Sequence, residues 1–237
     1  MPVRGVLFDV DDTLVDFSGA EESAVAAHLA ALGLLGAFPD AAGALALWRE
    51  VAEPAYARFL SGELTFTGQR RARVRAFLSH LGQSTDRLPD DDADAWFADY
   101  ETRHRAAWAA FPDAEPVLAR LVSGHRLGVV SNSSSATQRR KLGQVGLLPY
   151  LEAAIVCSDE YGEAKPAAGI FRAGCARLGL RPDEVAYVGD HYTIDGVGAR
   201  EAGLRAFWLD RAGSGVPVED GVRVISSLAE LPAALAR

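Results

Sequence analysis

Two carboxylates near the start of the chain, Asp9 and Asp11, are the residues whose type and spacing most suggest chemistry. They follow residues 6–8, a continuous apolar run of the kind that a strand buried on both faces shows. Residues i and i+2 of an extended chain point to the same side, so these carboxylates can converge on one site while Asp12 points elsewhere. Open α/β sheets bind ligands at the carboxyl ends of their strands. For an isolated pair an acidic, solvated turn is the better explanation, so the rest of the chain must decide.

Polar residues also follow an apolar run in the second half of the chain. That run ends in Ser131 and Asn132, whose hydroxyl and amide suit the binding of phosphoryl oxygens. Further on, Lys165 precedes Pro166, a residue that fits the first position of a helix. A cation just before a helix start would reinforce an anion site. Lys165 is one of only two lysines in the chain, the other being Lys141.

Two more carboxylates, Asp190 and Asp195, follow the apolar run at residues 185–189. Asp190 comes directly after the run, and Asp195 comes five residues later, where a helix is predicted to start. A helix cap would account for Asp195 alone. Carboxylates at a second strand end nevertheless repeat the arrangement at Asp9 and Asp11.

The elements that must position these residues alternate along the chain from residue 111 onward. We predict strands at residues 126–131, 153–158, 185–190, 206–210 and 222–225, and helices at residues 112–122, 134–144, 167–178, 195–202 and 228–236. Such alternation indicates βαβ units. The fold class is therefore α/β, with a Rossmann-like parallel sheet, helices on both faces, and the run at residues 6–8 as a further strand.

Residues 17–109 have a different character, with predicted helices and no convincing strand. Four helices are expected, at residues 18–35, 40–60, from about residue 67, and 90–110. Ser18 and Glu21 have the spacing of a capping box for the first of them. The predicted domains are an α/β catalytic core, residues 1–16 and 110–237, and an inserted helical domain, residues 17–109.

Two clusters of charge lie in this helical insertion. The basic cluster forms either a solvated helix surface or a contact to an anionic substrate. It comprises Arg70, Arg71, Arg73 and Arg75. The acidic cluster is expected in the first turn of the fourth helix, where carboxylates favour the N-terminal end of the dipole. It comprises Asp90, Asp91, Asp92 and Asp94.

The composition limits the possible functions. The chain has 237 residues, 49% of them hydrophobic, and a net charge of -8, which argues against sequence-independent nucleic-acid binding. Cys157 and Cys175 are too few for a disulfide framework or a zinc site and are expected to be buried thiols. The longest apolar stretch, residues 25–38, is too short for a membrane span, and no signal-like segment opens the chain. We expect a cytoplasmic protein without a membrane partner.

The motifs, taken in order, resemble those of the haloacid dehalogenase superfamily. The matching segments are DVDDT at residues 9–13, SN at 131–132, KP at 165–166 and GDHYTID at 189–195. The resemblance covers the whole predicted core, and residues 158–171 and 188–210 look like the family's small-molecule phosphatases. The inserted helices resemble the cap that the family places between its first and second motifs.

The resemblance implies a phosphomonoester hydrolase with Mg²⁺ as cofactor. Asp9 would be the nucleophile and form an aspartyl-phosphate, which splits the displacement into two steps. Asp11 would protonate the leaving alkoxide and then take a proton from the attacking water. A cation must offset the repulsion between nucleophile and phosphoryl group, and hard oxygen ligands suit Mg²⁺.

The same resemblance assigns the remaining site residues. The implied metal ligands are Asp9, Asp11 through its backbone carbonyl, Asp190 and Asp195. Contacts to the substrate are implied for Thr13, which also supports the turn, and for Ser131, Asn132 and Lys165. Lys165 also offsets the repulsion among the acids. Many relatives have serine where this chain has His191. Three roles are open for His191: a contact to the substrate, tuning of the metal site, or a place at the rim.

Related chemistries are alternatives. Sugar-phosphate mutases share the core motifs but rely on further basic cap residues, including a lysine, and no lysine lies between residues 16 and 110. The same absence nearly excludes phosphonate cleavage through an imine. Haloacid dehalogenases lack the second aspartate of the first motif, so Asp11 argues against them. A non-catalytic binding protein is disfavoured because no site residue is missing.

The motifs do not separate phosphatases of nucleotides, sugar phosphates, phosphoglycolate and acylneuraminate phosphates. In the resembling family, cap residues decide the substrate. The predicted partner is therefore a small phosphorylated metabolite, bound by a monomer or a homodimer, with no nucleic acid.

Overall fold

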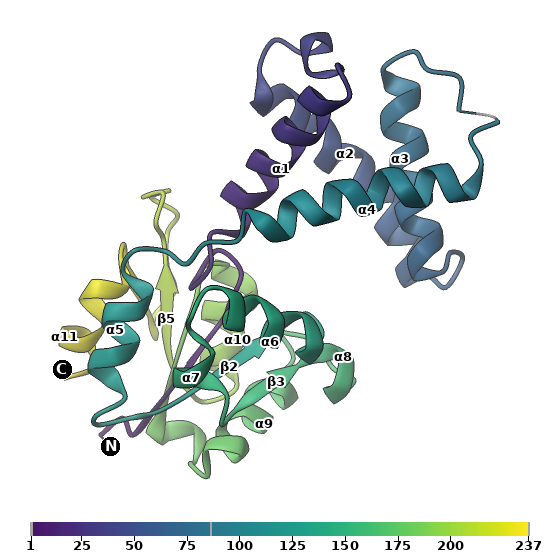
Figure 1. The fold of residues 1–237 in the computed structure, drawn as a ribbon. Coiled ribbons are helices and arrows are strands. Elements are labelled where there is room, and N and C mark those ends of the chain that lie inside the picture. Colours follow the sequence, from purple (N-terminus) through teal and green to yellow (C-terminus); the bar gives the residue numbers. More distant parts are fainter. Residues whose placement is uncertain (1, 86, 237) are drawn as a thin grey trace. The chain divides into compact units, whose positions relative to one another are not determined.

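The computed structural model describes residues 2–85 and 87–236 and divides the chain into two compact units (Figure 1). Unit 1 combines the two ends of the chain, up to Phe17 and from Trp108 onward. Unit 2 is the intervening segment Ser18–Ala107.

Unit 1 is built on a six-stranded parallel sheet. Its strands are β1 (Gly5–Phe8), β2 (Arg126–Ser131), β3 (Ile155–Cys157), β4 (Val185–Gly189), β5 (Arg205–Leu209) and β6 (Val222–Ile225), in the order β3-β2-β1-β4-β5-β6. Leu7 of the central strand β1 lies opposite Gly128 of β2 and Tyr187 of β4. The order reverses at β1 and β4, the place where open α/β sheets bind ligands. The predicted α/β, Rossmann-like fold class is confirmed.

Helices cover both faces of this sheet. They are α5 (Ala114–Leu121), α6 (Ser135–Gln144), α7 (Leu148–Leu151), α8 (Ser158–Tyr161), α9 (Ala168–Leu178), η2 (Pro182–Glu184), η3 (Tyr192–Val197), α10 (Gly198–Glu201), η4 (Leu228–Glu230) and α11 (Leu231–Leu235). Val6 and Phe8 belong to the core that contains residues of α5, α6, α7 and α11, whereas Leu7 belongs to the core formed with α9 and α10. The two-residue period of a strand thus divides one apolar run between two cores.

Unit 2 consists of helices joined by loops and has no strand among its described residues. Its elements are α1 (Phe17–Ala31), which starts at the end of unit 1, η1 (Leu35–Ala37), α2 (Ala41–Leu60), α3 (Phe66–His80) and α4 (Asp90–Ala106). Their apolar faces meet at Trp48, which is 1% exposed and lies edge-on to the ring of Phe77. Asp40 and Thr65 cap α2 and α3, each accepting a hydrogen bond from a backbone N–H three residues on.

The arginines of α3 pair with acids of the same unit. Arg71 and Arg75 both contact Asp90 in the first turn of α4, where the acidic cluster was predicted. Arg70 pairs with Glu101. Arg73 lies 3.3 Å from a carboxylate oxygen of Glu21, and its guanidinium lies 3.6 Å from the centre of the Trp48 ring. These contacts support a structural role over a contact to substrate.

Three local expectations were wrong or incomplete. Ser18 is the second residue of α1 rather than its cap, and Glu21 accepts hydrogen bonds from arginines instead of closing a capping box. The helix expected at residues 195–202 begins earlier, as the π-helical turn η3. The short helices α7 and α8 were not predicted, because four residues are too few to show helical periodicity.

Cys157 and Cys175 are buried free thiols, as predicted. Burial raises the pKa of Cys157 to about 11 and that of Cys175 to about 12, so neither is a ready nucleophile. Among residues 2–85 and 87–236, no helix is both long enough and apolar enough to cross a membrane.

Candidate active site

The polar residues predicted at strand ends meet at one edge of the sheet. Asp9 follows β1, Ser131 ends β2 and Asp190 follows β4, and these strands are neighbours with β1 in the middle. Together with Lys165 and Asp195 they line a pocket of about 250 Å³. The remaining lining residues are Asp11, Asp12, Asn132, His191 and Ile194.

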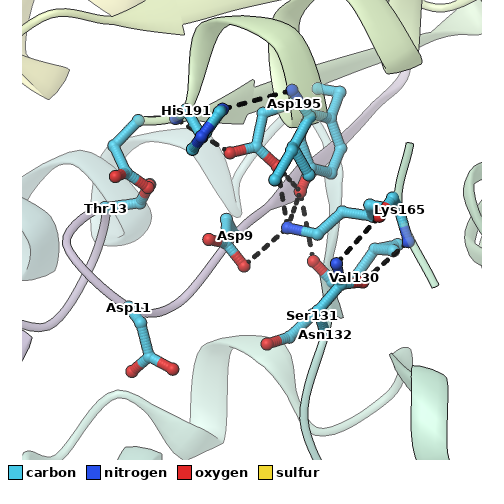
Figure 2. A network of polar contacts seen from close by, with 12 residues as sticks. Asp9, Asp11, Thr13, Val130, Ser131, Asn132, Lys165, His191 and Asp195 are labelled. Atoms are coloured by element: carbon cyan, nitrogen blue, oxygen red, sulfur yellow. Dashed lines mark hydrogen bonds and ion pairs between the residues drawn. The ribbon is translucent and has the colours of Figure 1, made fainter. Parts of the chain in front are cut away.

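Lys165 joins two of the carboxylates (Figure 2). Its Nζ lies 2.9 Å from Asp9 Oδ1 and 2.7 Å from Asp195 Oδ1, and only 3% of its side chain is exposed. Burial opposes the charge of Lys165, but the two acids outweigh this and raise its pKa above the ordinary value. Lys165 is therefore a fixed positive charge inside an acidic pocket.

Tyr187 is a site residue that the sequence did not reveal. Tyr187 lies in β4, and its hydroxyl accepts from Lys165 Nζ at 2.9 Å. The hydroxyl can donate to Asp195 Oδ1 at 3.0 Å or to the backbone oxygen of Val130 at 3.1 Å. Burial raises the pKa of Tyr187 well above 10, so the hydroxyl stays neutral. In the sequence it is simply an aromatic residue of an apolar strand. The available signal was that a buried tyrosine hydroxyl requires a polar partner.

Three carboxylates are arranged to share a cation. Asp9, Asp190 and Asp195 can each offer one oxygen such that all three oxygens lie within 4.8 Å of one another. Thr13 Oγ1 donates to Asp190 Oδ1 at 3.2 Å, and Trp208 Nε1 donates to the Asp190 backbone oxygen at 2.8 Å. A compact set of carboxylate oxygens fits a hard divalent cation such as Mg²⁺.

The crowding of these acids changes how readily they ionise. Burial, and to a smaller extent Asp195 and Asp11, raises the pKa of Asp9 to about 7, although Lys165 acts in the opposite direction. Burial and the neighbouring carboxylates raise the pKa of Asp190 to about 6. A cation bound among these oxygens would oppose both effects.

The close approach of Asp195 to β4 depends on Gly189. A Cβ added at Gly189 would lie 2.4 Å from Asp195 Cγ, closer than any real contact of this kind. The backbone N–H of His191 donates to Asp195 Oδ2 at 3.0 Å, and His191 Nδ1 accepts from the backbone N–H of Ile194 at 3.3 Å. His191 thus lies exposed at the rim and caps η3.

Asn132 and Thr13 support other residues of the site. Asn132 Nδ2 donates to the backbone oxygen of Lys165 at 2.9 Å, and Asn132 Oδ1 accepts from the Lys165 backbone N–H at 2.7 Å. Thr13 is fully buried, and its hydroxyl is directed to Asp190. The hydrogen bonds of these two side chains therefore position Lys165 and Asp190, and the predicted contacts to substrate stay predictions.

Asp11 is held differently from Asp9. Figure 2 shows its carboxylate turned away from Asp9. One oxygen forms an ion pair with Lys141 of α6, and the other accepts from Gln138 Nε2 at 3.0 Å. The same amide nitrogen lies 3.0 Å from Ser131 Oγ. No site role was predicted for Gln138 or Lys141.

The turn after β1 is held by Arg211, which follows the end of β5. Asp12 adopts a left-handed conformation, with φ of 55°, which aspartate tolerates better than most residues. Arg211 Nη2 donates to the Thr13 backbone oxygen at 2.9 Å. The same guanidinium forms two hydrogen bonds with Asp113, of 3.0 and 2.9 Å. This fork-like pairing fixes the arginine that holds the turn.

The sequence of the chain is similar to a known family and to enzymes with named activities. The family model of haloacid dehalogenase-like hydrolases matches residues 3–203. A phosphoserine phosphatase of Thermus thermophilus is 34% identical over 168 residues, which are 70% of this chain and 63% of that enzyme. A glyceraldehyde 3-phosphate phosphatase of Methanothermobacter thermautotrophicus is 30% identical over 88% of this chain and 86% of its own.

The fold also matches solved structures. The crystal structure of the HAD-hydrolase YfnB from Bacillus subtilis, bound to magnesium, covers 100% of both chains with a TM-score of 0.78 and 24% identity. This likeness concerns the fold. The family model matches most of the chain, and the site lies at the carboxyl edge of the sheet. The chain therefore belongs to the haloacid dehalogenase-like hydrolases.

Proposed function

We propose that the protein hydrolyses small-molecule phosphomonoesters through an aspartyl-phosphate on Asp9. The observation that carries the proposal is the position of Asp9, at the end of β1, within 2.9 Å of Lys165 and beside Asp190 and Asp195. A carboxylate nucleophile requires nearby positive charge to approach an anionic phosphoryl group. The named activities of the two curated relatives, both phosphatases, support the same reaction.

Asp9, Asp190 and Asp195 would hold Mg²⁺, and the backbone carbonyl of Asp11 would complete the set that the family resemblance implies. Bound Mg²⁺ would supply the charge neutralisation that lets one anion attack another. The all-oxygen character of the cluster supports this choice over softer metals.

In the first step, a carboxylate oxygen of Asp9 attacks phosphorus while the bond from phosphorus to the ester oxygen breaks. Asp11 gives its proton to the departing alkoxide, so that the alcohol leaves neutral. Lys165 and Ser131 hold the phosphoryl oxygens. Because the Gln138 amide donates to Ser131 Oγ, the hydroxyl proton of Ser131 is directed elsewhere and is available for a phosphoryl oxygen.

In the second step, water attacks the phosphorus of the aspartyl-phosphate. Asp11, now a carboxylate, takes a proton from this water, and the bond between Asp9 and phosphorus breaks. Phosphate leaves, Asp9 is again a carboxylate and Asp11 is again protonated. The two steps therefore return every group to its starting state.

We assign the choice of substrate to unit 2. It is inserted between the first and second motifs, the place of the family's helical cap. Nucleotides, sugar phosphates, phosphoglycolate and acylneuraminate phosphates are all candidates, and the relatives' different substrates do not choose among them.

A panel of phosphomonoesters, assayed with Mg²⁺ and again with excess EDTA, tests the proposal. Phosphate release from at least one member, lost in EDTA and restored by Mg²⁺, is the expected result. A sugar-phosphate mutase assay and chloride release from 2-chloropropionate test the alternatives in parallel. No phosphate release from any member, together with activity in either parallel assay, would overturn the proposal.

A further inference from the structure

Lys141, one of the chain's two lysines, is buried and has no role in the hydrolysis proposed above. Lys141 lies on α6 and is 1% exposed, yet its ammonium forms an ion pair with Asp11. A buried ammonium is costly unless it is paired. Among the described residues, Asp11 is the acid with which Lys141 forms an ion pair, and that carboxylate is itself partly open to the pocket, with 32% of its side chain exposed. The ion pair with Asp11 thus offsets the cost of burying the Lys141 ammonium.

Two side chains of α6 bind the carboxylate of Asp11. Gln138 and Lys141 are three residues apart on α6, so both side chains leave the same face of the helix. Lys141 contacts Asp11 Oδ1, and Gln138 Nε2 lies 3.0 Å from Asp11 Oδ2. In the carboxylate form each oxygen therefore has its own donor, which fixes the rotation of the group as well as its position. In the protonated form one oxygen carries the proton and the other still accepts, so one of the two contacts holds the group.

The ammonium of Lys141 also lies over two aromatic rings. It lies 4.8 Å from the centre of the Phe17 ring and 5.4 Å from the centre of the Trp108 ring. Ring faces attract a cation and exclude water around it. Phe17 and Trp108 are also the residues where unit 1 ends before unit 2 and resumes after it. The carboxylate of Asp11 is thereby tied to both chain segments that leave and enter unit 1.

We propose that Lys141, assisted by Gln138, is the positioning residue for the acid/base group Asp11. The proposal rests on the hydrolysis proposed above, and it adds a residue outside the sequence motifs. Lys141 does not touch the phosphoryl group; it holds the Asp11 carboxylate at the rim of the pocket, where the leaving oxygen and later the attacking water must pass. Without it, Asp11 can rotate towards solvent, because its side chain is already partly exposed.

Removing Lys141 should therefore damage proton transfer selectively. The parameter kcat/KM reports only the steps up to cleavage of the ester bond. With p-nitrophenyl phosphate the leaving group departs without a proton, whereas with benzyl phosphate, of similar shape, the alkoxide requires one. A misplaced acid should lower kcat/KM for benzyl phosphate and leave that for p-nitrophenyl phosphate nearly unchanged.

The test compares Lys141→Met, Asp11→Asn, the double variant and Arg140→Met with both esters in Mg²⁺. Arg140 lies on the same helix but is exposed, so its variant controls for the lost charge. For benzyl phosphate we expect kcat/KM to fall about 10- to 100-fold in Lys141→Met and about 10²-fold or more in Asp11→Asn. For p-nitrophenyl phosphate both should stay within about threefold of wild type, and Lys141→Met should add nothing in the Asp11→Asn background.

The outcomes separate the two proposals. Equal losses of kcat/KM for both esters in Lys141→Met, or additive losses in the double variant, overturn the positioning role. If Asp11→Asn still lowers kcat/KM for benzyl phosphate alone, the hydrolytic mechanism stands. Equal losses for both esters in Asp11→Asn overturn the acid role itself. Melting curves establish that each variant is folded at the assay temperature. If Lys141→Met is not folded at that temperature, Lys141→Gln replaces it in the same assays, because glutamine keeps a polar side chain without the charge.

Discussion

Lys165 Nζ and Asp9 Oδ1 lie 2.9 Å apart, and only 3% of the lysine side chain is exposed. The same ammonium lies 2.7 Å from Asp195. Lys165 therefore both neutralises the proposed nucleophile and orders a second carboxylate. A charge fixed in this way needs no reorganisation when the phosphoryl group arrives.

Replacing this lysine should damage catalysis and folding together. In Lys165→Met we expect kcat to fall by about 10²- to 10³-fold or more, because the phosphoryl oxygens lose a fixed cation. The free energy of unfolding should fall by on the order of 3 kcal/mol, because buried carboxylates lose their partner. Steady-state kinetics and urea unfolding measure the two effects. Arg172→Met, which removes an exposed charge from α9, is the control, and an equal effect of both variants would refute the role of Lys165.

Mg²⁺ should stabilise the folded protein in the absence of any substrate. At about 100 times its dissociation constant, a ligand bound only by the folded state adds about 2.7 kcal/mol to the free energy of unfolding. We expect Mg²⁺ to raise the melting temperature of wild type but not that of Asp190→Asn, with NaCl at equal ionic strength as the salt control. Asp183→Asn, at an exposed acid outside the pocket, should respond like wild type. The same Mg²⁺ shift in Asp190→Asn would exclude this carboxylate as a ligand.

Gly189→Ala tests the packing of the metal-site carboxylates. The new Cβ would lie 2.4 Å from Asp195 Cγ, so Asp195 or β4 must move. Overpacking of this kind costs about 1–3 kcal/mol, and the Mg²⁺-dependent rise in melting temperature should shrink as well. Gly124→Ala is the matched control, because no atom lies within 4 Å of the position of its Cβ. Unchanged Mg²⁺ stabilisation in Gly189→Ala would contradict the proposed geometry.

Asp113 should make stability depend on acid pH. Burial alone would raise its pKa, but Arg211, Ser227 and the backbone N–H of Leu228 outweigh burial and hold the pKa of Asp113 below its ordinary value. A lowered folded-state pKa contributes stability that is complete above the unfolded-state pKa, about 3.9, and is lost as the pH falls through the folded-state value.

Asp113→Asn should consequently be less stable than wild type at pH 7, by about 1–3 kcal/mol, and the difference should shrink below about pH 4. Urea unfolding at several pH values measures it. Glu115→Gln, at an exposed residue of α5, provides the control. A difference that stays constant down to pH 3 would show that the Asp113 charge does not carry this stability.

Much of the fold follows from local patterns in the sequence. The strands β2 and β6 have the limits predicted for them, because apolar runs between turn residues mark buried parallel strands. The helix α2 also has nearly its predicted limits and continues through Pro54. The short helices α7 and η2 were not predicted, because a single helical turn shows no period.

The strand-end residues of the site were predictable from topology, whereas Lys165 and Asp195 were predicted through the resemblance to the family's motifs. Asp9, Ser131 and Asp190 converge because the carboxyl ends of adjacent parallel strands share one edge, a rule that needs no side-chain detail. Lys141 and Gln138 were missed because their role depends on which face of α6 packs inward. Both are polar residues at helical spacing beside the buried Leu142, and this was the available signal.

The central claim, that Asp9 is the nucleophile, is tested most directly by the turnover of Asp9→Asn. The variant, verified by mass to have kept its asparagine, is assayed with p-nitrophenyl phosphate and Mg²⁺ beside wild type, and its melting curve establishes that it is folded. The account predicts a loss in kcat of about 10⁴-fold or more, since an amide cannot form the covalent intermediate. A folded Asp9→Asn variant that keeps Mg²⁺-dependent turnover within about tenfold of wild type would contradict it.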